Sequence, residues 1–95
     1  MMNKYTIKVT GIFKKDLKQI EKRGYNIKKL NDIVEILASG NKLHEKYKDH
    51  NLTGNYKGYR ECHIEPDWLL VYKIENNILV LTLSRTGTHS DLFRK

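Results

Sequence analysis

The feature that most constrains the fold of this chain is a change in the hydrophobic pattern at Tyr59. From Tyr59 onward the pattern has a period of two, in three runs that read YRECHI, WLLVYKI and ILVLTLSR. A period of two indicates strands, and the dipeptides between the runs, Pro66-Asp67 and Asn76-Asn77, are typical of tight turns. The sequence therefore predicts a three-stranded antiparallel meander.

The two turns also predict a register for the meander. If both turns are two-residue loops, Glu65 pairs with Trp68, and Trp68 lies opposite Arg85. Directly opposite residues share a face of the sheet, so this register places His63, Glu65, Trp68 and Arg85 on one face. We expect a site at the end of the sheet that holds the first turn, where the C-terminal tail can also bring His89.

Two amphipathic helices are predicted before the meander. The first ends at Gly24, and the second begins after Asn26, a typical N-cap, and ends at Gly40. Alternation over residues 5–9 predicts a short strand with one buried face ahead of the helices. We expect the 95 residues to form a single α+β domain in the order β-α-α-β-β-β. In this domain, the N-terminal strand and a helical hairpin pack on an antiparallel sheet, followed by a short C-terminal tail.

The polar segment 41–58 separates the second helix from the meander and shows no clear period. Structureless segments of this length are uncommon in compact domains and are usually functional or disordered. Three apolar side chains can hold it against the body of the protein: Leu43, Tyr47 and Leu52. Such contacts favour the functional alternative, and the segment also contains His44 and His50.

Positive charge is concentrated in the first half of the chain. The formal net charge is +7, and residues 1–57 hold 13 lysines and arginines against 6 acidic residues, whereas residues 58–95 hold 5 of each. Such an excess favours a polyanionic partner, either nucleic acid or an acidic protein. The alternative is that the lysines only solvate the helices, and charge alone leaves both interpretations open.

The single cysteine, Cys62, excludes an internal disulfide and favours a reducing compartment. The sequence has no apolar run of about 18 residues or more, the length expected of a membrane-spanning helix, and its first residues lack the apolar core of a signal peptide. We therefore expect a cytoplasmic protein without a membrane partner.

The expected site carries groups suited to cutting RNA without a metal. Attack by the 2′-hydroxyl of RNA needs a base for the hydroxyl proton, an acid for the 5′-oxygen and a cation for the charged phosphoryl transition state. The candidates for these roles are His63, Asp67, Arg85 and His89. Each has an ordinary alternative: a structural histidine, a turn residue, or an ion pair of Arg85 with Glu61 or Glu65.

A zinc site of His50, His63 and His89 would be a different use of the same residues. The sequence contains none of the short spacings CxxC, HxxxH or HExxH that are typical of zinc sites. We therefore expect no metal and no cofactor.

Two long motifs resemble one family of toxins. Residues 50–72, HNLTGNYKGYRECHIEPDWLLVY, and residues 83–93, LSRTGTHSDLF, are similar to the YafQ branch of the RelE/ParE toxin superfamily. The resemblance implies a RelE-like domain and the toxin of a type II toxin-antitoxin system. It further implies a ribosome-dependent endonuclease that cuts translated mRNA in the A site by 2′-hydroxyl attack and is inhibited by a cognate antitoxin.

The resemblance also implies roles for individual residues. His89 resembles the general acid, and the general base is left open among His50, His63 and Asp67. Arg85 matches the arginine that stabilises the phosphoryl charge. The residues that would contact RNA are Phe93, Lys48 and Lys57, and Arg94 and Lys95 could add phosphate contacts. The implied partners are mRNA, the rRNA of the 70S ribosome and an antitoxin with an acidic segment.

Two alternative functions remain from the sequence. The first is a noncatalytic inhibitor of DNA gyrase on the same fold, as in ParE-like proteins. The cluster of histidines argues against this function, because gyrase inhibition does not require acid and base groups. The second is a ribosome-binding or RNA-binding module in which the histidines bind phosphate without cutting RNA.

Overall fold

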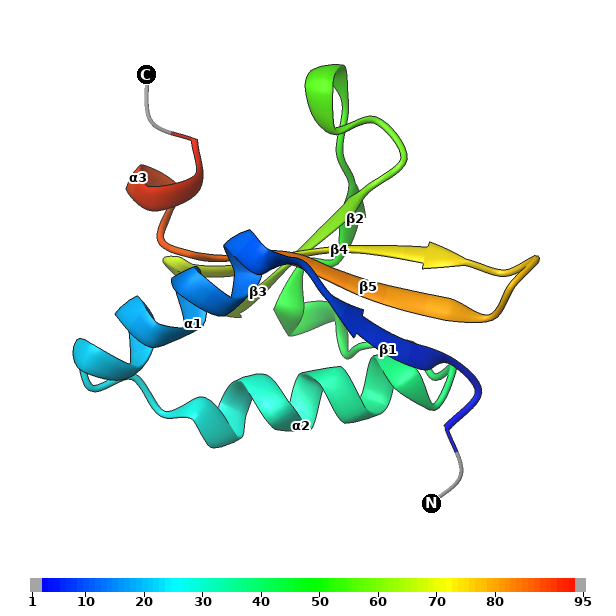
Figure 1. Cartoon of the computed structure of the whole chain (residues 1–95), viewed down its shortest axis with the longest axis horizontal. Helices are drawn as coiled ribbons and strands as arrows, with labels where there is room; N and C mark the ends of the chain where they lie inside the picture. Colours follow the sequence, from blue (N-terminus) through cyan, green and yellow to red (C-terminus); the bar gives the residue numbers. More distant parts are fainter. Residues whose placement is uncertain (1–2, 94–95) are drawn as a thin grey trace.

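The computed structural model describes residues 3–93, which form a five-stranded sheet, two long helices and a short C-terminal helix (Figure 1). The strands are β1 (Thr6–Val9), β2 (His50–Asn51), β3 (Arg60–Glu65), β4 (Trp68–Glu75) and β5 (Val80–Gly87). The helices are α1 (Gly11–Lys22), α2 (Ile27–Ala38) and α3 (His89–Leu92), and two 3-10 turns are η1 (Glu45–Tyr47) and η2 (Gly54–Tyr56). The predicted α+β fold is confirmed, and β2 and α3 are additions to it.

The helix boundaries follow local signals in the sequence. The hydroxyl of Thr10 accepts a hydrogen bond of 2.9 Å from the amide of Phe13 and caps α1, and Asn26 caps α2 through a bond of 3.1 Å. Gly24 and Gly40, which follow the two helices, have φ angles of +82° and +86°. These are angles that glycine adopts without the steric penalty of a side chain, so both predicted helix ends are confirmed.

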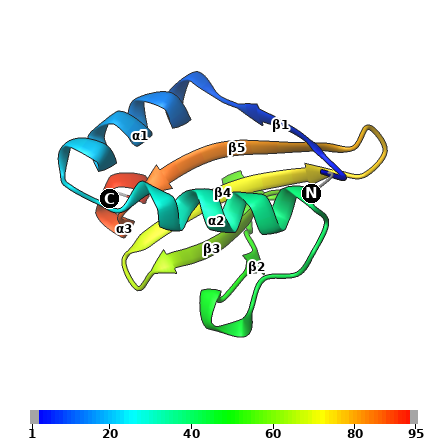
Figure 2. The same ribbon diagram turned by 90° about the horizontal axis from the view of Figure 1, so that it is seen from below.

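The sheet has two different faces. The order of strands is β1-β5-β4-β3-β2, and α2 lies across one face, whereas α1 lies beside β5 (Figure 2). The main core lies between the helices and this first face and includes Ile20, Ile33, Trp68, Leu70 and Tyr72.

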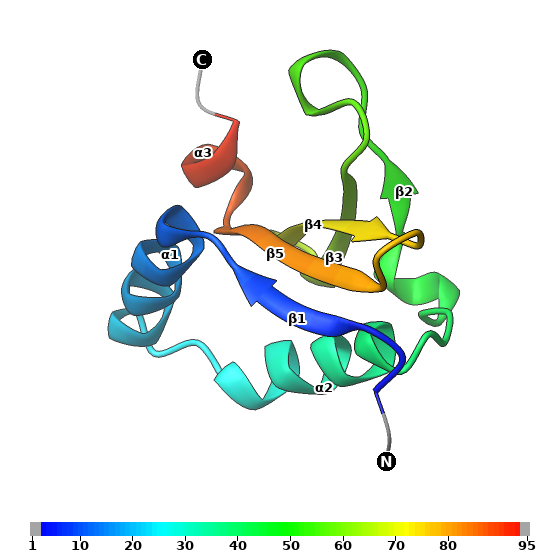
Figure 3. The same ribbon diagram turned by 45° about the vertical axis from the view of Figure 1, so that its right-hand side comes forward.

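The second face, which we call the open face, has a smaller apolar cluster. Its members are Leu69, Val71 and Leu92, with Leu52, Tyr56 and Tyr59 packed against them. Strand β2, the loop after it and α3 lie on this side of the sheet, away from α2 (Figures 1 and 3). These three segments therefore border the open face without forming a second layer of long helices.

Strand β1 differs from its prediction in burial. It pairs with β5 in parallel at the edge of the sheet, with Thr6 opposite Val80. Tyr5, just before the strand, is buried, but Ile7 and Val9 are 39% and 40% exposed. The predicted buried face of this strand is therefore wrong for Ile7 and Val9, because an edge strand of four residues has no further layer over it.

The first turn of the meander is confirmed and the second is longer than predicted. Glu65 pairs with Trp68, as expected for a two-residue turn. Glu75 pairs with Val80, so the second loop spans residues 76–79. Leu79 has a φ angle of +53°, in the left-handed region, so the chain is still turning at this residue and enters the β4–β5 ladder only at Val80. The predicted two-residue loop at this position is therefore wrong.

The predicted common face of His63, Glu65, Trp68 and Arg85 is also wrong. The register shifts between His63 and Glu65 in β3, and again between residues 83 and 85 in β5. As a result, Trp68 lies in the main core and Glu65 binds Lys29 of α2 at 2.6 Å. His63 lies opposite Leu69 and Arg85 lies opposite Val71, so both are on the open face.

The segment 41–58 is ordered by the contacts that the sequence predicted. Leu43 and Tyr47 pack against the main core, and Leu52 packs against the cluster on the open face.

Within the described residues, no helix is long and apolar enough to cross a membrane. The predicted phosphate contacts of Arg94 and Lys95 fall outside the described part of the chain.

Candidate active site on the open face

His89 and Asp67 form a closely bound pair where the first turn meets α3. One Asp67 oxygen, Oδ1, accepts the backbone N–H of His89 at 2.9 Å and lies 2.5 Å from its Nδ1. The backbone bond, together with the side-chain bond, lowers the pKa of Asp67 below its ordinary value. Since a carboxylate accepts, Nδ1 of His89 donates, which leaves Nε2 as the ring nitrogen that is available to a substrate.

The helix that carries His89 is fixed to the body of the protein by α1. Thr88 and Asp91 form a reciprocal capping box at the start of α3. Arg23, which follows α1, donates to both carboxylate oxygens of Asp91, at 2.6 and 3.2 Å. The hydrogen bond from Arg23 lowers the pKa of Asp91 to about 2. The position of His89 therefore depends on a contact between residues that are 68 apart in the sequence.

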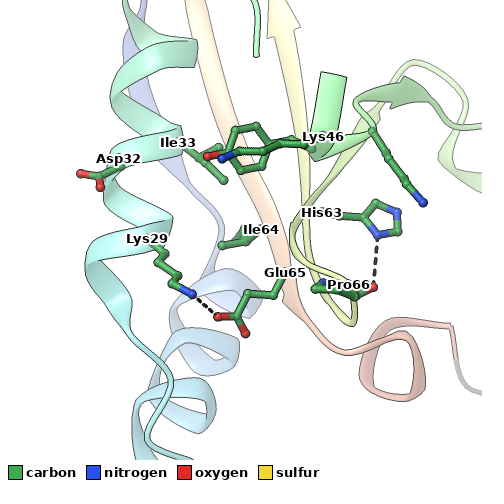
Figure 4. A pocket seen from close by; sticks show the side chains of 10 residues that line it. Lys29, Asp32, Ile33, Lys46, His63, Ile64, Glu65 and Pro66 are labelled. Atoms are coloured by element: carbon green, nitrogen blue, oxygen red, sulfur yellow. Dashed lines mark hydrogen bonds and ion pairs between the residues drawn. The ribbon is translucent and has the colours of Figure 1, made fainter. Parts of the chain in front are cut away.

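His63 projects from β3 onto the open face, next to His89. The centroids of the two imidazole rings are 5.6 Å apart. Nδ1 of His63 lies 3.2 Å from the carbonyl of Pro66, and because a carbonyl only accepts, Nδ1 is the donor. Figure 4 shows the His63 ring on the opposite side of β3 from Ile64 and Glu65. The ring nitrogen that is left, Nε2, faces Glu61 Oε1 at 3.8 Å.

His50 completes a row of three imidazoles. It lies in β2, directly opposite Glu61, and its ring centroid is 6.4 Å from that of His63. Its Nδ1 donates to the carbonyl of Lys48 at 2.7 Å, and its Nε2 lies 3.5 Å from Glu61 Oε1. The backbone of Lys48 is in the left-handed region, with φ +50°, and this conformation turns the chain into β2.

A partly buried hydrogen-bond network holds β2 and therefore His50 in place. Arg60 donates to both carboxylate oxygens of Asp49, at 3.0 to 3.3 Å, and to the side-chain oxygen of Asn51 at 2.6 Å. The hydroxyl of Tyr72, a core residue, donates to the same Asp49. Because Asp49 directly precedes His50, strands β3 and β4 set the position of this histidine.

Arg85 lies on the same face but is bound by a residue that the sequence did not suggest. Its Nε and Nη2 donate to the carboxylate of Asp16 in α1, at 2.8 and 3.1 Å, and this contact raises the pKa of Arg85. The suggested ion pair with Glu61 or Glu65 is wrong. A guanidinium has five N–H groups in a planar fork, and the bonds to Asp16 use Nε and Nη2 but leave the edge that carries Nη1 outside this contact.

Aromatic side chains continue the open face beyond the histidines. The ring of Phe93 is 36% exposed and meets that of Tyr56 edge to face, with centroids 5.7 Å apart. Tyr56 meets Tyr59 in the same way at 6.2 Å. After the contact with Asp16, Tyr56 also contributes to the raised pKa of Arg85.

The two predicted lysines are exposed on the segment 41–58. Lys57 follows η2. Lys48 and His63 both line a cavity of about 510 Å³ between α2 and β3, whose walls include Ile33 and Ile64 (Figure 4). Lys48 is near the imidazole of His50 through its backbone carbonyl, which accepts a hydrogen bond from Nδ1 of that ring.

Glu61 is the residue of the site that sequence reasoning missed. The sequence suggests Glu61 only as an ion-pair partner for Arg85, whereas the structure places its buried side chain against His50 and His63. The signal that could have found it is parity, since Glu61 and His63 are two residues apart on one strand and so share a face.

The site contains residue types that bind metals, but not in a recognisable metal-binding arrangement. Among residues 3–93, no group of three or more His, Cys, Asp or Glu side chains is placed to hold a metal ion. Cys62 is fully buried in the main core, and burial raises the pKa of its thiol. Cys62 is therefore neither a metal ligand nor an activated nucleophile.

Comparison with known proteins identifies the family. Residues 5–94 match the family model described as the bacterial toxin of type II toxin-antitoxin system, YafQ. The chain belongs to the YafQ toxin family. The mRNA interferase toxin YafQ of Escherichia coli K12 is 42% identical over 88 residues, covering 92% of this chain and 94% of that toxin.

Solved structures of bacterial toxins share the fold of this family member. YafQ in the E. coli DinJ-YafQ toxin-antitoxin complex has a TM-score of 0.87 and 41% identity, covering 95% of this chain and 98% of that chain. A metal-bound toxin from Helicobacter pylori has a TM-score of 0.88 and 47% identity, covering 94% of this chain and 99% of that one. The RelE-like architecture that the two sequence motifs implied is thereby confirmed.

Proposed function

We propose that this YafQ-family toxin is a cytoplasmic endoribonuclease that cuts translated mRNA in the ribosomal A site by attack of the 2′-hydroxyl, without a metal ion. The observation that carries the proposal is the row of His50, His63 and His89 on one face, with Asp67 at one end and Arg85 across the sheet. The name of the E. coli relative, an mRNA interferase, agrees with this chemistry.

Each group has a role in the proposed reaction. Nε2 of His50 or His63 takes the proton of the 2′-hydroxyl while the 2′-oxygen forms a bond to phosphorus. The bond from phosphorus to the 5′-oxygen breaks, and that oxygen takes a proton from Nε2 of His89, whose ring Asp67 orients. The free edge of Arg85 stabilises the charge of the phosphoryl group. Phe93, which is exposed, offers ring surface on which a base can stack.

The decisive experiment is primer extension on a reporter mRNA in a purified translation system, with and without ribosomes. We expect cuts at in-frame positions only when ribosomes are present. In a parallel test of short RNA bound to ribosomes, replacing free divalent ions with polyamines should leave the cleavage rate unchanged. Stalled translation without cuts would instead indicate a ribosome-binding module. No effect on translation, with inhibition of supercoiling by purified gyrase, would indicate a ParE-like inhibitor.

We also propose that the lysines of the first half bind rRNA phosphates and an acidic segment of the antitoxin. Phosphate contacts release counterions, so affinity should fall steeply with salt. If 6 to 10 phosphates are contacted, we expect binding to 70S ribosomes to weaken by about 10³- to 10⁵-fold between 50 and 200 mM monovalent salt. Filter binding at constant Mg²⁺ measures this change.

The salt experiment has a matched variant on the exposed surface of α1. Replacing Lys14 and Lys18 by glutamine should reduce the logarithmic salt slope by about one for each lysine that touches a phosphate. A flat salt response of the wild-type protein would remove the electrostatic explanation of ribosome binding.

A further inference from the structure

Glu61 is a buried carboxylate at the centre of the open face. Only 5% of its surface is exposed. One of its oxygens, Oε1, lies 3.5 Å from Nε2 of His50 and 3.8 Å from Nε2 of His63. The other oxygen, Oε2, is buried and has no hydrogen-bond partner among the described residues. One of the two carboxylate oxygens of Glu61 is thus buried without a hydrogen bond from the described residues.

The position of Glu61 in the sheet does not explain why a carboxylate is there. Across the sheet it lies opposite Val71, which belongs to the apolar cluster. A buried charge with an unsatisfied oxygen costs stability, and an apolar or amide side chain would fit the same place at lower cost. Such a residue is expected where a function requires its charge.

The hydrogen bonds of the two histidines specify what that charge faces. Nδ1 of each ring is turned to a carbonyl, that of Lys48 for His50 and that of Pro66 for His63. Each ring therefore presents its second nitrogen, Nε2, toward the same Glu61 oxygen. These are also the two nitrogens that can take the proton of the 2′-hydroxyl in the proposed reaction.

We propose that Glu61 is a positioning residue that serves His50 and His63 together. Its Oε1 lies 3.5 and 3.8 Å from the two Nε2 atoms, so its negative charge balances the positive charge that either imidazole gains when it accepts the hydroxyl proton. No new bond to Glu61 forms in this step: the O–H bond of the ribose breaks and the N–H bond of the imidazole forms. The inference rests on the proposed endonuclease function and adds a residue to its machinery.

The first test is Glu61→Gln in single-turnover cleavage of ribosome-bound mRNA. Glutamine keeps the size of the side chain and removes its charge, so we expect cleavage to be about 10- to 100-fold slower, the typical effect of losing a charge-assisted contact. Ribosome affinity should stay within about twofold, and the melting temperature should be equal or higher, because the buried charge is gone. Glu61→Asp, which keeps the charge on a shorter side chain, should recover part of the lost rate.

The matched control is Glu65→Gln on the same strand. Glu65 undergoes the same change of charge, but it faces α2 and binds Lys29. Its cleavage rate should stay within about twofold of wild type, the small effect expected away from the reacting groups. Equal losses in the two variants would overturn the inference, because they would reflect charge in general.

A spectroscopic measurement tests the contact without relying on activity. In Glu61→Gln, the ¹⁵N signals of the His50 and His63 ring nitrogens should move, while those of His89 should stay in place. Unmoved His50 and His63 signals, or a wild-type cleavage rate in Glu61→Gln, would overturn the inference and leave the endonuclease function standing. A wild-type protein that cuts no mRNA would overturn the endonuclease function first, and the inference with it.

Discussion

We expect His89→Ala to slow the cleavage of ribosome-bound mRNA by about 10²- to 10⁴-fold, the usual contribution of a positioned general acid. The leaving 5′-oxygen would then depart without a proton from the protein. His89 is exposed, and its side chain binds only Asp67 among the described residues, so the free energy of unfolding should change little. Quenched-flow cleavage of labelled mRNA and urea unfolding together measure both quantities.

Two further variants separate acid catalysis from other effects of the substitution. Asp67→Asn keeps the acceptor oxygen but weakens the bond that orients the His89 ring, so we expect an intermediate loss of cleavage. His44→Ala removes an exposed histidine that caps η1 on the segment 41–58, and it should cut at about the wild-type rate. If His89→Ala is folded and cuts mRNA as fast as wild type, the assignment of the general acid is wrong.

The largest loss of stability is expected for Trp68→Ala. Trp68 is fully buried, and its ring meets that of Tyr25 edge to face at 5.1 Å. Its Nε1–H donates to the hydroxyl of Thr86 at 2.9 Å, and that hydroxyl donates to the carbonyl of Leu69. Truncation would leave a large cavity and remove a buried hydrogen bond. We expect a loss of about 3 to 5 kcal/mol in the free energy of unfolding.

A loss of this size is a large part of the roughly 5 to 15 kcal/mol that is typical of the free energy of unfolding of small domains. Urea unfolding followed by circular dichroism measures it, with Trp68→Phe as the matched variant that keeps an aromatic ring and should lose less. Because Trp68 is fully buried in the main core, its role in the structure is packing. If Trp68→Ala were as stable as wild type but bound ribosomes more weakly, Trp68 would be a base-stacking surface and the packing assignment would be wrong.

The parts of the fold that the sequence predicted correctly depend on neighbouring residues. The caps at Thr10 and Asn26 bond to amides two or three residues away, and the turn at 66–67 joins strands that are adjacent in the chain. Local hydrogen bonds and turn geometry of this kind are encoded within a few positions. The pattern of apolar residues then gave the order of the elements, because burial of one face imposes a period of 3.6 or 2.

The candidate site was also predicted only in part, with the residues selected by the sequence and several of their contacts shown only by the structure. The motif around residues 50–72 and 83–93 was enough to select the three histidines and Asp67, and the structure brings these side chains together. The two motifs did not show that Asp16 binds Arg85, a contact between residues 69 apart in the sequence. Nor did they show that Glu61 lies between two imidazoles, which requires β2 to pair with β3.

The sequence by itself determined the two long helices, the strands β1, β3, β4 and β5, their order and most of the chemical groups of the site, because these depend on local hydrogen bonds, on periodicity and on residue type. Only the tertiary structure decided which face each group occupies. Single extra residues in β3 and β5 shift the register, and one such shift moves every later side chain to the other face of the sheet. Whether a strand accommodates such a bulge depends on packing against distant elements, which is why His63 and Arg85 share a face with Glu61 and not with Trp68.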